Sequence, residues 1–364
     1  MVYTTIQLCL NKIISEVPKM IKMWEEIMEQ PGVLSKCLEK NSETIYSIVK
    51  SIKQTEIHSV IIAARGTSDH AAVYGKYIIE LMTGIPVSLA APSVFTLYQK
   101  KLKLKGSLVI GISQSGQAED VLEVIKAAKE DGAVTVSITN FEDSPLALHS
   151  KFHLNCECGE EKSVAATKTF TAQMFLLASL VAQWTEDEDM KKELSALPEL
   201  ISETFKISEE IMNNVKRYRF MNECFVLARG INYAVALETS LKIQETTYVR
   251  AKAYATSDFH HGPFAMIDDN MPVFVFAPNG ISTNDMTEMI NKLKKQGADI
   301  TIISNNEEIL KMGNCSFKIP QTSNDMISPF LNVVVAQMFA CQLALVKGLN
   351  PDSPRCLNKV TITR

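Results

Sequence analysis

The sequence repeats itself at a fixed distance, and this repeat limits the possible fold more than any other feature. The repeated positions are Arg65-Gly66 and Arg229-Gly230 (229 − 65 = 164), Ser113 and Ala277 (277 − 113 = 164), and Asn140 and Asn305 (305 − 140 = 165). A register held over about 75 residues indicates a tandem duplication of one structural unit. We therefore expect two domains with the same topology.

Each copy alternates apolar strands with helical patterns. Residues 59–89 predict a strand, a glycine turn, a helix, a glycine stop and a second strand. The segments 109–124 and 133–140 add a strand with its helix and one further strand, and residues 224–245 and 272–305 repeat this order. Strands that alternate with helices pair in parallel and carry helices on both faces of the sheet. The expected fold class is α/β, with two three-layer αβα domains.

The length agrees with this organisation, because 364 residues exceed twice the roughly 150 that are typical of one domain. The charged stretch 184–205 is the expected connection between the domains. Residues 11–30 predict a helix that ends at Pro31-Gly32 and packs on a domain or on a partner subunit. The expected parts are a helical segment at 1–40, a first domain at 41–190, a second domain at 191–349 and a tail at 350–364.

Composition excludes several classes of function. A net charge of −4 gives no broad basic surface for nucleic acid or an anionic membrane. The eight cysteines lack metal-ligand spacing, so no metal is expected. Met1 leads into polar sequence without the basic-then-apolar pattern of a signal peptide, so we expect none, and apolar runs such as 174–184 are too short to span a membrane. We expect a cytoplasmic protein with free thiols.

The first copy carries hydroxyl side chains where its strands turn into helices. Thr67-Ser68 follow one strand, Ser113 and Ser115 follow the next, and Ser163, Thr167, Lys168 and Thr169 open a third, apolar helix. The matching loops of the second copy have no hydroxyls. Helix N-termini with added hydroxyl donors suit a phosphate, although each Ser or Thr could also be a simple helix cap. Neither nucleotide-binding glycine motif is present, so a phosphorylated small metabolite is favoured and no cofactor is expected.

Acid–base groups gather in the second copy. Lys242 and Glu245 are three residues apart and share a helix face, a spacing that on its own favours a solvated salt bridge. The turn His260–Pro263 fixes the backbone that presents His261. Lys359 lies in a short polar tail, which would usually be a frayed end.

Five stretches together carry a family resemblance: "ARGTSDHA", "ISQSGQAED", "SVAATKTFTAQ", "LKIQE…AYATSDFHHGP" and "SPRCLNKVT". In this order they resemble the tandem sugar isomerase (SIS) domains of the isomerase module of glucosamine 6-phosphate synthase. The likeness runs from about residue 40 to the C-terminus. It implies two flavodoxin-like domains and a homodimer that builds the sites.

The resemblance also implies roles for single residues. It makes Glu245 the base that moves a proton between C1 and C2, and His261 the group that assists ring opening, reaching the site from a partner subunit. Lys242 and Lys359 become charges at the sugar, with Lys359 the candidate for imine contact with an open-chain ketose. The residues implied to hold the phosphate and hydroxyls or to lie beside the sugar are Gly66, Thr67, Ser68, Ser113, Gln114, Ser115, Val164 and Ala166.

The sequence departs from the synthase in ways that bear on the reaction. The synthase has an N-terminal glutaminase domain, whereas this sequence begins "MVYTTIQ" and enters the sugar repeats within its first 40 residues. We therefore expect no release of ammonia from glutamine by that route. Ala118 and Ala166 replace hydroxyl residues, and "KAYATSD" replaces a more acidic stretch, which puts the substrate in doubt.

The stretches "RGTSDHA" and "AAPSVFTLY" look most like the SIS-type glucosamine-6-phosphate deaminases. The resulting hypothesis is conversion of glucosamine 6-phosphate to fructose 6-phosphate and ammonia. Three alternatives stay open: a deglycase that cleaves fructosamine 6-phosphates, a plain aldose–ketose isomerase, and a phosphosugar-binding protein without turnover.

Overall fold

The computed structural model describes residues 21–359, which form two parallel sheets of five strands each. The first sheet has the order β2-β1-β3-β4-β5, and the second has β10-β9-β8-β6-β7. Read from the other edge, the second sheet repeats the first strand by strand. The 2-1-3-4-5 order is the flavodoxin-like arrangement, so the predicted fold class and the duplication are confirmed.

The strands form because their sequences are short, apolar and rich in β-branched residues. All residues of β3 and β4 are buried, as expected for parallel strands that are covered on both faces. The strands of the first sheet are β1 Ser59–Ala63, β2 Val87–Leu89, β3 Ser107–Ile112, β4 Val134–Thr139 and β5 Phe152–Asn155. Those of the second are β6 Glu223–Ala228, β7 Arg250–Ala255, β8 Pro272–Phe276, β9 Asp299–Ser304 and β10 Cys315–Lys318.

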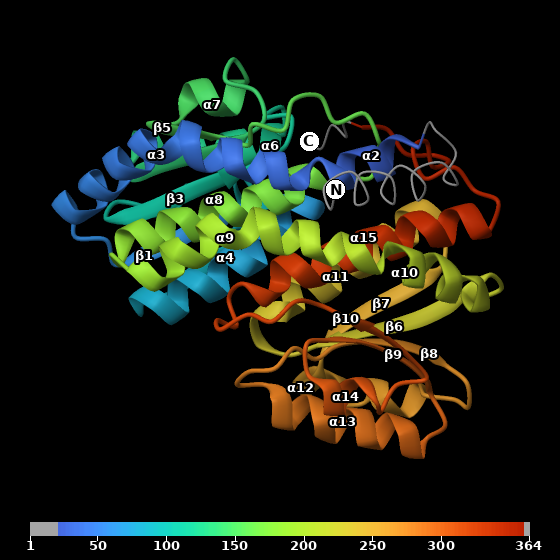
Figure 1. Ribbon diagram of the computed structural model, residues 1–364. Coiled ribbons are helices and arrows are strands. Elements are labelled where there is room, and N and C mark those ends of the chain that lie inside the picture. The colour runs from blue at the N-terminus through green and yellow to red at the C-terminus, as the bar shows by residue number, and fades with distance from the viewer. Residues whose placement is uncertain (1–20, 360–364) are drawn as a thin grey trace, which may run out of the picture.

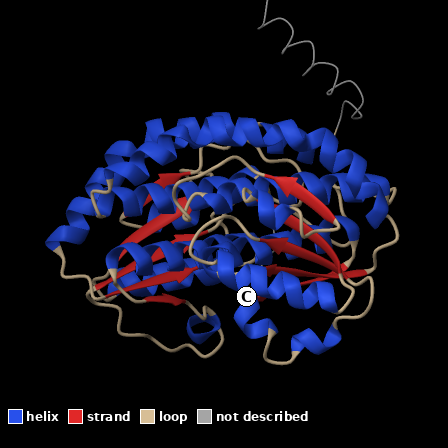
Figure 2. Cartoon of the chain, turned by 60° about the horizontal axis from the view of Figure 1, so that its bottom comes forward, coloured by secondary structure: helices blue, strands red, loops and turns tan. Residues whose placement is uncertain are grey.

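Helices cover both sheets and fill the space between them (Figures 1 and 2). The helices up to the end of the first copy are α2 Lys22–Met28, α3 Gln30–Gln54, α4 Thr67–Thr83, α5 Ser93–Thr96, α6 Glu119–Glu130, α7 Pro145–His149 and α8 Lys168–Trp184. Those that follow are α9 Glu188–Thr204, α10 Ser208–Asn214, α11 Tyr233–Thr247, α12 Thr256–Phe259, α13 Thr283–Lys295, α14 Glu307–Leu310 and α15 Ser328–Val346. Short 3₁₀ turns are η1 Phe205–Ile207, η2 Val215–Tyr218, η3 Gly230–Asn232 and η4 Pro263–Met266.

The two halves, β1–α8 and β6–α15, share one apolar core. Helix α4 packs on α8 and on α11, and α11 packs on α15, so helices of both halves meet in the layer between the sheets. This contact brings the start of α4 in the first half against α11 in the second. The layer between the sheets is therefore where side chains from both copies can combine.

Helix α15 corrects the expectation that no apolar stretch approaches the length of a membrane span. It is long and apolar enough to cross a membrane by length and composition alone, but 89% of its most apolar 18-residue stretch is buried inside the protein. It packs against α9 and α11. Its apolar surface on all sides is explained by this position in the core.

The N-terminal segment also differs from the prediction. Helix α2 ends at Met28, and Pro31 lies in the first turn of α3 instead of ending a helix. A proline is well placed there because the first helical N–H groups have no intrahelical acceptor. Helix α2 packs on α15 of the same chain, and residues 11–20 of the predicted helix lie outside the described residues. Helices α3 and α9 run through the positions proposed as domain boundaries, at 40–41 and 190–191.

Candidate functional site

Lys242 lies at the centre of a polar cluster between the two halves. Its side chain is only 1% exposed, and its Nζ lies 2.5 Å from Glu245 Oε2 and 3.4 Å from Glu238 Oε1. All three side chains come from one face of α11, at the three- and four-residue spacing of a helix. The interpretation of Lys242 and Glu245 as a solvated surface pair is therefore wrong, because the ammonium is buried.

The first half completes this cluster with the start of α4. Lys242 Nζ donates to Thr67 Oγ1 at 3.2 Å, and Thr67 Oγ1 donates to Glu238 Oε1 at 3.2 Å. His70 Nδ1 lies 2.8 Å from the other oxygen of Glu238. The structure thus brings Thr67, Lys242 and Glu245 together as predicted, and adds Glu238 and His70. The position of Glu238, four residues before Lys242, was the signal that sequence reasoning missed.

The charges in this cluster keep the lysine protonated. Burial alone would lower the pKa of Lys242, but the neighbouring carboxylates Glu238 and Glu245 outweigh it and raise that pKa above its usual range. A buried ammonium with two carboxylates can stabilise negative charge that develops on a bound oxygen. Glu245, whose side chain is 22% exposed, remains reachable from outside the cluster.

The loop after β3, residues 113–116, has the features of an anion-binding loop. Within residues 21–359 the backbone N–H groups of Gln114 and Ser115 donate to no other group, and Ala118 provides no side-chain cap for α6. Gly116 has φ +64°, and a Cβ there would lie 2.2 Å from Ser144 Oγ, so only glycine fits. Free N–H groups at a helix N-terminus favour an anion such as phosphate.

The neighbouring loop after β1 lies beside this one because β1 and β3 are paired. Arg65 Nε donates to Asp120 Oδ2 at 2.6 Å, which ties the β1 loop to the first turn of α6. Gly66 takes φ +55° just before α4, and Ser68 is buried in the first turn of that helix. These contacts place both predicted loops at the carboxyl edge of one sheet, where ligands of parallel α/β folds bind.

The third hydroxyl-rich segment has a different role from the one predicted. Glu161 occupies the N-terminus of α8, where its carboxylate accepts from Thr167 N at 2.9 Å, Thr169 N at 3.3 Å and Thr169 Oγ1 at 2.8 Å. A protein carboxylate thus takes the position that the hydroxyls suggested for a phosphate. Val164 and Ala166, the residues implied to lie beside the sugar, are half-buried in the segment just before this helix.

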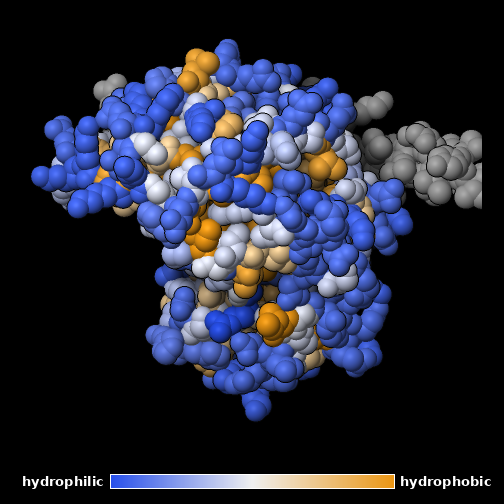
Figure 3. Space-filling view, turned by 90° about the vertical axis from the view of Figure 1, so that its left-hand side faces the viewer, coloured by the Kyte–Doolittle hydropathy of each residue, from blue (hydrophilic) through white to orange (hydrophobic). Residues whose placement is uncertain are grey.

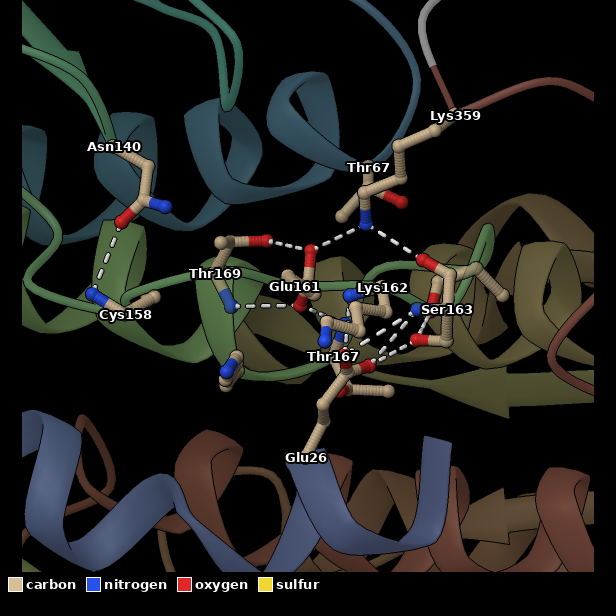
Figure 4. A network of polar contacts seen from close by, with 12 residues as sticks. Glu26, Thr67, Asn140, Cys158, Glu161, Lys162, Ser163, Thr167, Thr169 and Lys359 are labelled. Atoms are coloured by element: carbon tan, nitrogen blue, oxygen red, sulfur yellow. Dashed lines mark hydrogen bonds and ion pairs between the residues drawn. The ribbon is translucent and has the colours of Figure 1, made fainter. Parts of the chain in front are cut away.

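Lys359 reaches the same segment from the C-terminal tail (Figure 4). Its Nζ lies 2.8 Å from Glu161 Oε2 and donates to the Ser163 carbonyl at 2.7 Å. The tail is therefore docked next to Val164 in the described structure, in contrast to the frayed end that composition alone suggests. His261 is exposed in the turn between α12 and η4, and the hydrogen bonds and ion pairs of the described residues do not join its side chain to Lys242 or Glu245.

The comparisons with known proteins agree with this architecture. The SIS domain family profile matches residues 55–183 and again residues 221–347, once in each half. The chain is 36% identical over 343 residues to the glutamine–fructose-6-phosphate aminotransferase (isomerizing) of Aquifex aeolicus, and 33% identical over 347 residues to that of Thermococcus kodakarensis. These matches cover 94% and 93% of this chain but only 57% of either relative, so the chain spans little more than half of their length.

Two solved structures extend the likeness. The C-terminal domain of glucosamine-fructose-6-phosphate aminotransferase from Francisella tularensis superposes with a TM-score of 0.80 at 25% identity, covering 92% of this chain and 98% of that one. Glucosamine-6-phosphate deaminase from Thermotoga maritima gives 0.75 at 25% identity, covering 94% and 100%. With a family match in both halves and the predicted fold in each, the chain belongs to the SIS family of phosphosugar isomerases and carries two SIS domains in tandem.

Proposed function

We propose that this protein deaminates glucosamine 6-phosphate to fructose 6-phosphate and ammonia. The observation that carries the proposal is the buried Lys242–Glu245 pair lying against Thr67 of the first half. This contact sets a proton-transfer carboxylate and a fixed positive charge beside the loops that suit a phosphate. The resemblance to a glucosamine-6-phosphate deaminase over 94% of the chain supports the choice of substrate.

The reaction follows from these groups. The β3 loop, with Ser113, Gln114 and Ser115, holds the phosphate, and the sugar extends toward α11. In the open-chain sugar Glu245 removes the proton from C2 and returns it to C1, while the Lys242 ammonium stabilises the oxygen that gains negative charge. The C1 aldehyde oxygen takes up one proton and becomes an alcohol, while the C2 amine gives up one proton and becomes an imine. Water then adds to the imine and ammonia leaves, which gives fructose 6-phosphate.

Two further residues have proposed roles at the sugar. Lys359 contributes a positive charge beside Val164, where its ammonium is already held by Ser163 and Glu161. His261 assists ring opening from a partner subunit, and its exposed position leaves it free to enter a second copy. Figure 3 shows apolar surface near the waist between the halves, on a face that also carries smaller apolar patches higher up, and such surface supports a homodimer. The seven described cysteines are free, which supports a reducing, cytoplasmic setting.

The test is to incubate the purified protein with glucosamine 6-phosphate and to measure ammonia and fructose 6-phosphate together. We expect both in equal amounts, and a loss of at least about 10³-fold in Glu245→Gln because the proton shuttle is removed. Glu288→Gln is the matched control, since Glu288 forms a helical pair with Lys292 at 2.6 Å that is exposed on α13. That variant keeps full activity.

Other products would replace the proposal by one of its alternatives. Glucose 6-phosphate formed from a fructosamine 6-phosphate, without turnover of the amino sugar, indicates the deglycase. Interconversion of glucose 6-phosphate and fructose 6-phosphate without ammonia indicates a plain isomerase. Tight binding of these sugars without any product indicates a binding protein.

The shared site has its own test. We expect an equimolar mixture of Glu245→Ala and His261→Ala chains, refolded together, to regain part of the activity that each lacks alone. In mixed dimers one site then receives an intact glutamate and an intact histidine. A mixture as inactive as its components would place His261 and Glu245 in one chain's site.

A further inference from the structure

The segment before α8, residues 160–167, is held by carboxylates from two sides; we call it the α8 loop (Figure 4). On one side Glu161 bonds to the first turn of α8 and pairs with Lys359. Its carboxylate is completely buried. Because Lys359 also donates to the Ser163 carbonyl, the ammonium is fixed between two points of the same loop.

On the other side Glu26 of α2 holds the loop. Its carboxylate accepts from the backbone N–H groups of Lys162 and Ser163 and from the Ser163 hydroxyl, and its side chain is almost fully buried. Asp352 connects this helix to the tail, since its carboxylate accepts from Lys22 N at 2.9 Å and Met23 N at 2.8 Å. Its carbonyl accepts from Val164 N at 3.2 Å. The α8 loop, α2 and the tail thus form one closed set of hydrogen bonds.

The Glu161 carboxylate accepts hydrogen bonds from Thr167 and Thr169 at the start of α8, but its negative charge is balanced by the Lys359 ammonium. Burial alone would raise the pKa of Glu161, but the Lys359 ammonium, together with hydrogen bonds from Thr167 and Thr169, outweighs burial and holds this pKa below its usual range. A buried ion pair that loses one partner leaves the other charge uncompensated. The position of Lys359 in the tail therefore depends on the negative charge of Glu161. The first turn of α8, in contrast, needs only an oxygen atom at position 161 that accepts its hydrogen bonds.

We propose that Glu161 is a positioning residue that fixes the Lys359 ammonium, and with it residues 352–359 of the tail, against the α8 loop beside the sugar. This inference rests on the proposed function, in which Lys359 acts at the sugar. It adds to the residues of the proposed function a buried carboxylate, Glu161, that does not touch the substrate. Glu161 acts through Lys359, and Glu26 and Asp352 hold the loop and the tail in the matching position.

The experiment compares Glu161→Gln with Glu160→Gln. The neighbouring Glu160 side chain is 75% exposed and pairs only with the exposed Lys162 among the described residues. In Glu161→Gln we expect amide hydrogen exchange in residues 352–359 to become at least about tenfold faster, as local opening becomes easier. With glucosamine 6-phosphate, kcat falls about 10- to 100-fold while KM stays within about threefold, because the phosphate is held by the β3 loop. Glu160→Gln changes none of these quantities.

A double-mutant cycle separates positioning from a general effect on folding. In a Lys359→Ala background, Glu161→Gln lowers kcat no further, because the residue through which it acts is gone. An equal loss in both backgrounds would overturn the inference and assign Glu161 to the structure of α8. If Glu161→Gln does not fold, Lys359→Ala decides alone, since unchanged exchange in residues 352–358 would show that the ion pair does not hold the tail.

The exchange measurement also separates this inference from the proposed function. If the wild-type protein does not turn over glucosamine 6-phosphate, the proposed function fails. Faster exchange of the tail in Glu161→Gln would then still support positioning by Glu161. Normal turnover with unchanged exchange and unchanged kcat in that variant overturns the positioning role alone.

Discussion

The loop after β3 in the first half and the loop after β8 in the second occupy the same place in two copies of one fold, yet their backbone groups are satisfied differently. The β3 loop leaves N–H groups without acceptors within residues 21–359. In the β8 loop, residues 277–280, Asn279 N donates to Asn305 Oδ1 at 2.7 Å and Gly280 N donates to Thr283 Oγ1 at 2.8 Å. The Asp325 carboxylate accepts from Ile281 N just after this loop, and it lies so close to Gly280 that a Cβ there would be 1.7 Å from Asp325 Oδ1.

This difference explains how one duplicated fold supplies two kinds of chemistry. The second half satisfies the N–H groups of its own loop with Asn305 and Thr283, and the Asp325 carboxylate beside Gly280 disfavours a second anion such as phosphate there. Its helix α11 instead provides Lys242 and Glu245. The first half keeps the open loop and contributes Thr67 to the contact. Under the proposed function, the two copies thus contribute different groups to one site.

Of the changes that test this comparison, a carboxylate placed in the β3 loop should have the largest effect, which is a loss of affinity for the sugar phosphate. In Ser115→Asp we expect the affinity for glucosamine 6-phosphate to fall about 100-fold, roughly 2.7 kcal/mol, because the new charge repels the phosphate. Asn279→Asp is the control, since 279 − 115 = 164 places it at the matching position of the second half. Titration calorimetry measures both. Equal losses in the two variants would contradict the assignment of the phosphate to the first half.

In each half an ion pair joins the loop after the first strand, β1 or β6, to the helix that follows the neighbouring strand, α6 or α13. The two ion pairs differ in how deeply the aspartate is buried. Arg65–Asp120 and Arg229–Asp285 are equivalent pairs, but the Asp120 side chain is 2% exposed and that of Asp285 is 61% exposed. We expect Asp120→Asn to lower the free energy of unfolding by about 2 kcal/mol and Asp285→Asn by less than about 0.5 kcal/mol. Urea unfolding measures both values. Similar losses would mean that the loops are not held differently.

Acid should weaken the first half through Glu161. Its pKa lies below the ordinary value of 4.5, so its contribution to stability is complete above pH 4.5 and is lost as the pH falls through the depressed pKa. Below pH 4.5 the wild type should therefore lose stability more steeply than Glu161→Gln, by up to about 1.4 kcal/mol per pH unit. Thermal unfolding at several pH values measures the two slopes. Parallel slopes would show that the Lys359 pair does not stabilise the carboxylate.

Replacing the equivalent glycines of the two halves should have the smallest effect on stability and substrate binding. Gly66 and Gly230 have φ +55° and +60°, and a Cβ at either meets no atom within 4 Å. Gly66→Ala and Gly230→Ala should each cost about 1 kcal/mol, because only the backbone conformation is unfavourable. Only Gly66→Ala should raise KM, since it displaces Thr67 at the start of α4. If Gly230→Ala raises KM as much, the comparison between the halves fails at this position.

The fold could be predicted because its signals are local. The strands are continuous apolar runs, and the repeat fixes their order twice over. Pro31 was misread because a proline can end one helix or begin the next, and only the packing of α2 and α3 decides between these. Helix α15 was overlooked as a long apolar helix because its sequence has no polar face that would mark it as a separate element.

The site was only partly predictable, since it depends on how the halves dock. Helical spacing predicted the shared face of Lys242 and Glu245, but the burial of Lys242 requires α4 to pack on α11. The hydroxyls near α8 predicted a phosphate at that helix, but the anion that lies there is the Glu161 carboxylate. The sequence pattern could not distinguish a phosphate from the protein's own Glu161, since both satisfy the same N–H and hydroxyl donors.

The contact of Asp352 with the first turn of α2 joins residues that are 330 positions apart in the chain. During synthesis, a ribosome releases the first half long before it reaches Asp352, and domains generally fold in that order. Residues 352–359 therefore reach the α8 loop only after both sheets have been synthesised. If Lys359 acts at the sugar as proposed, a nascent chain that has folded both sheets but lacks residue 359 should not yet turn over glucosamine 6-phosphate.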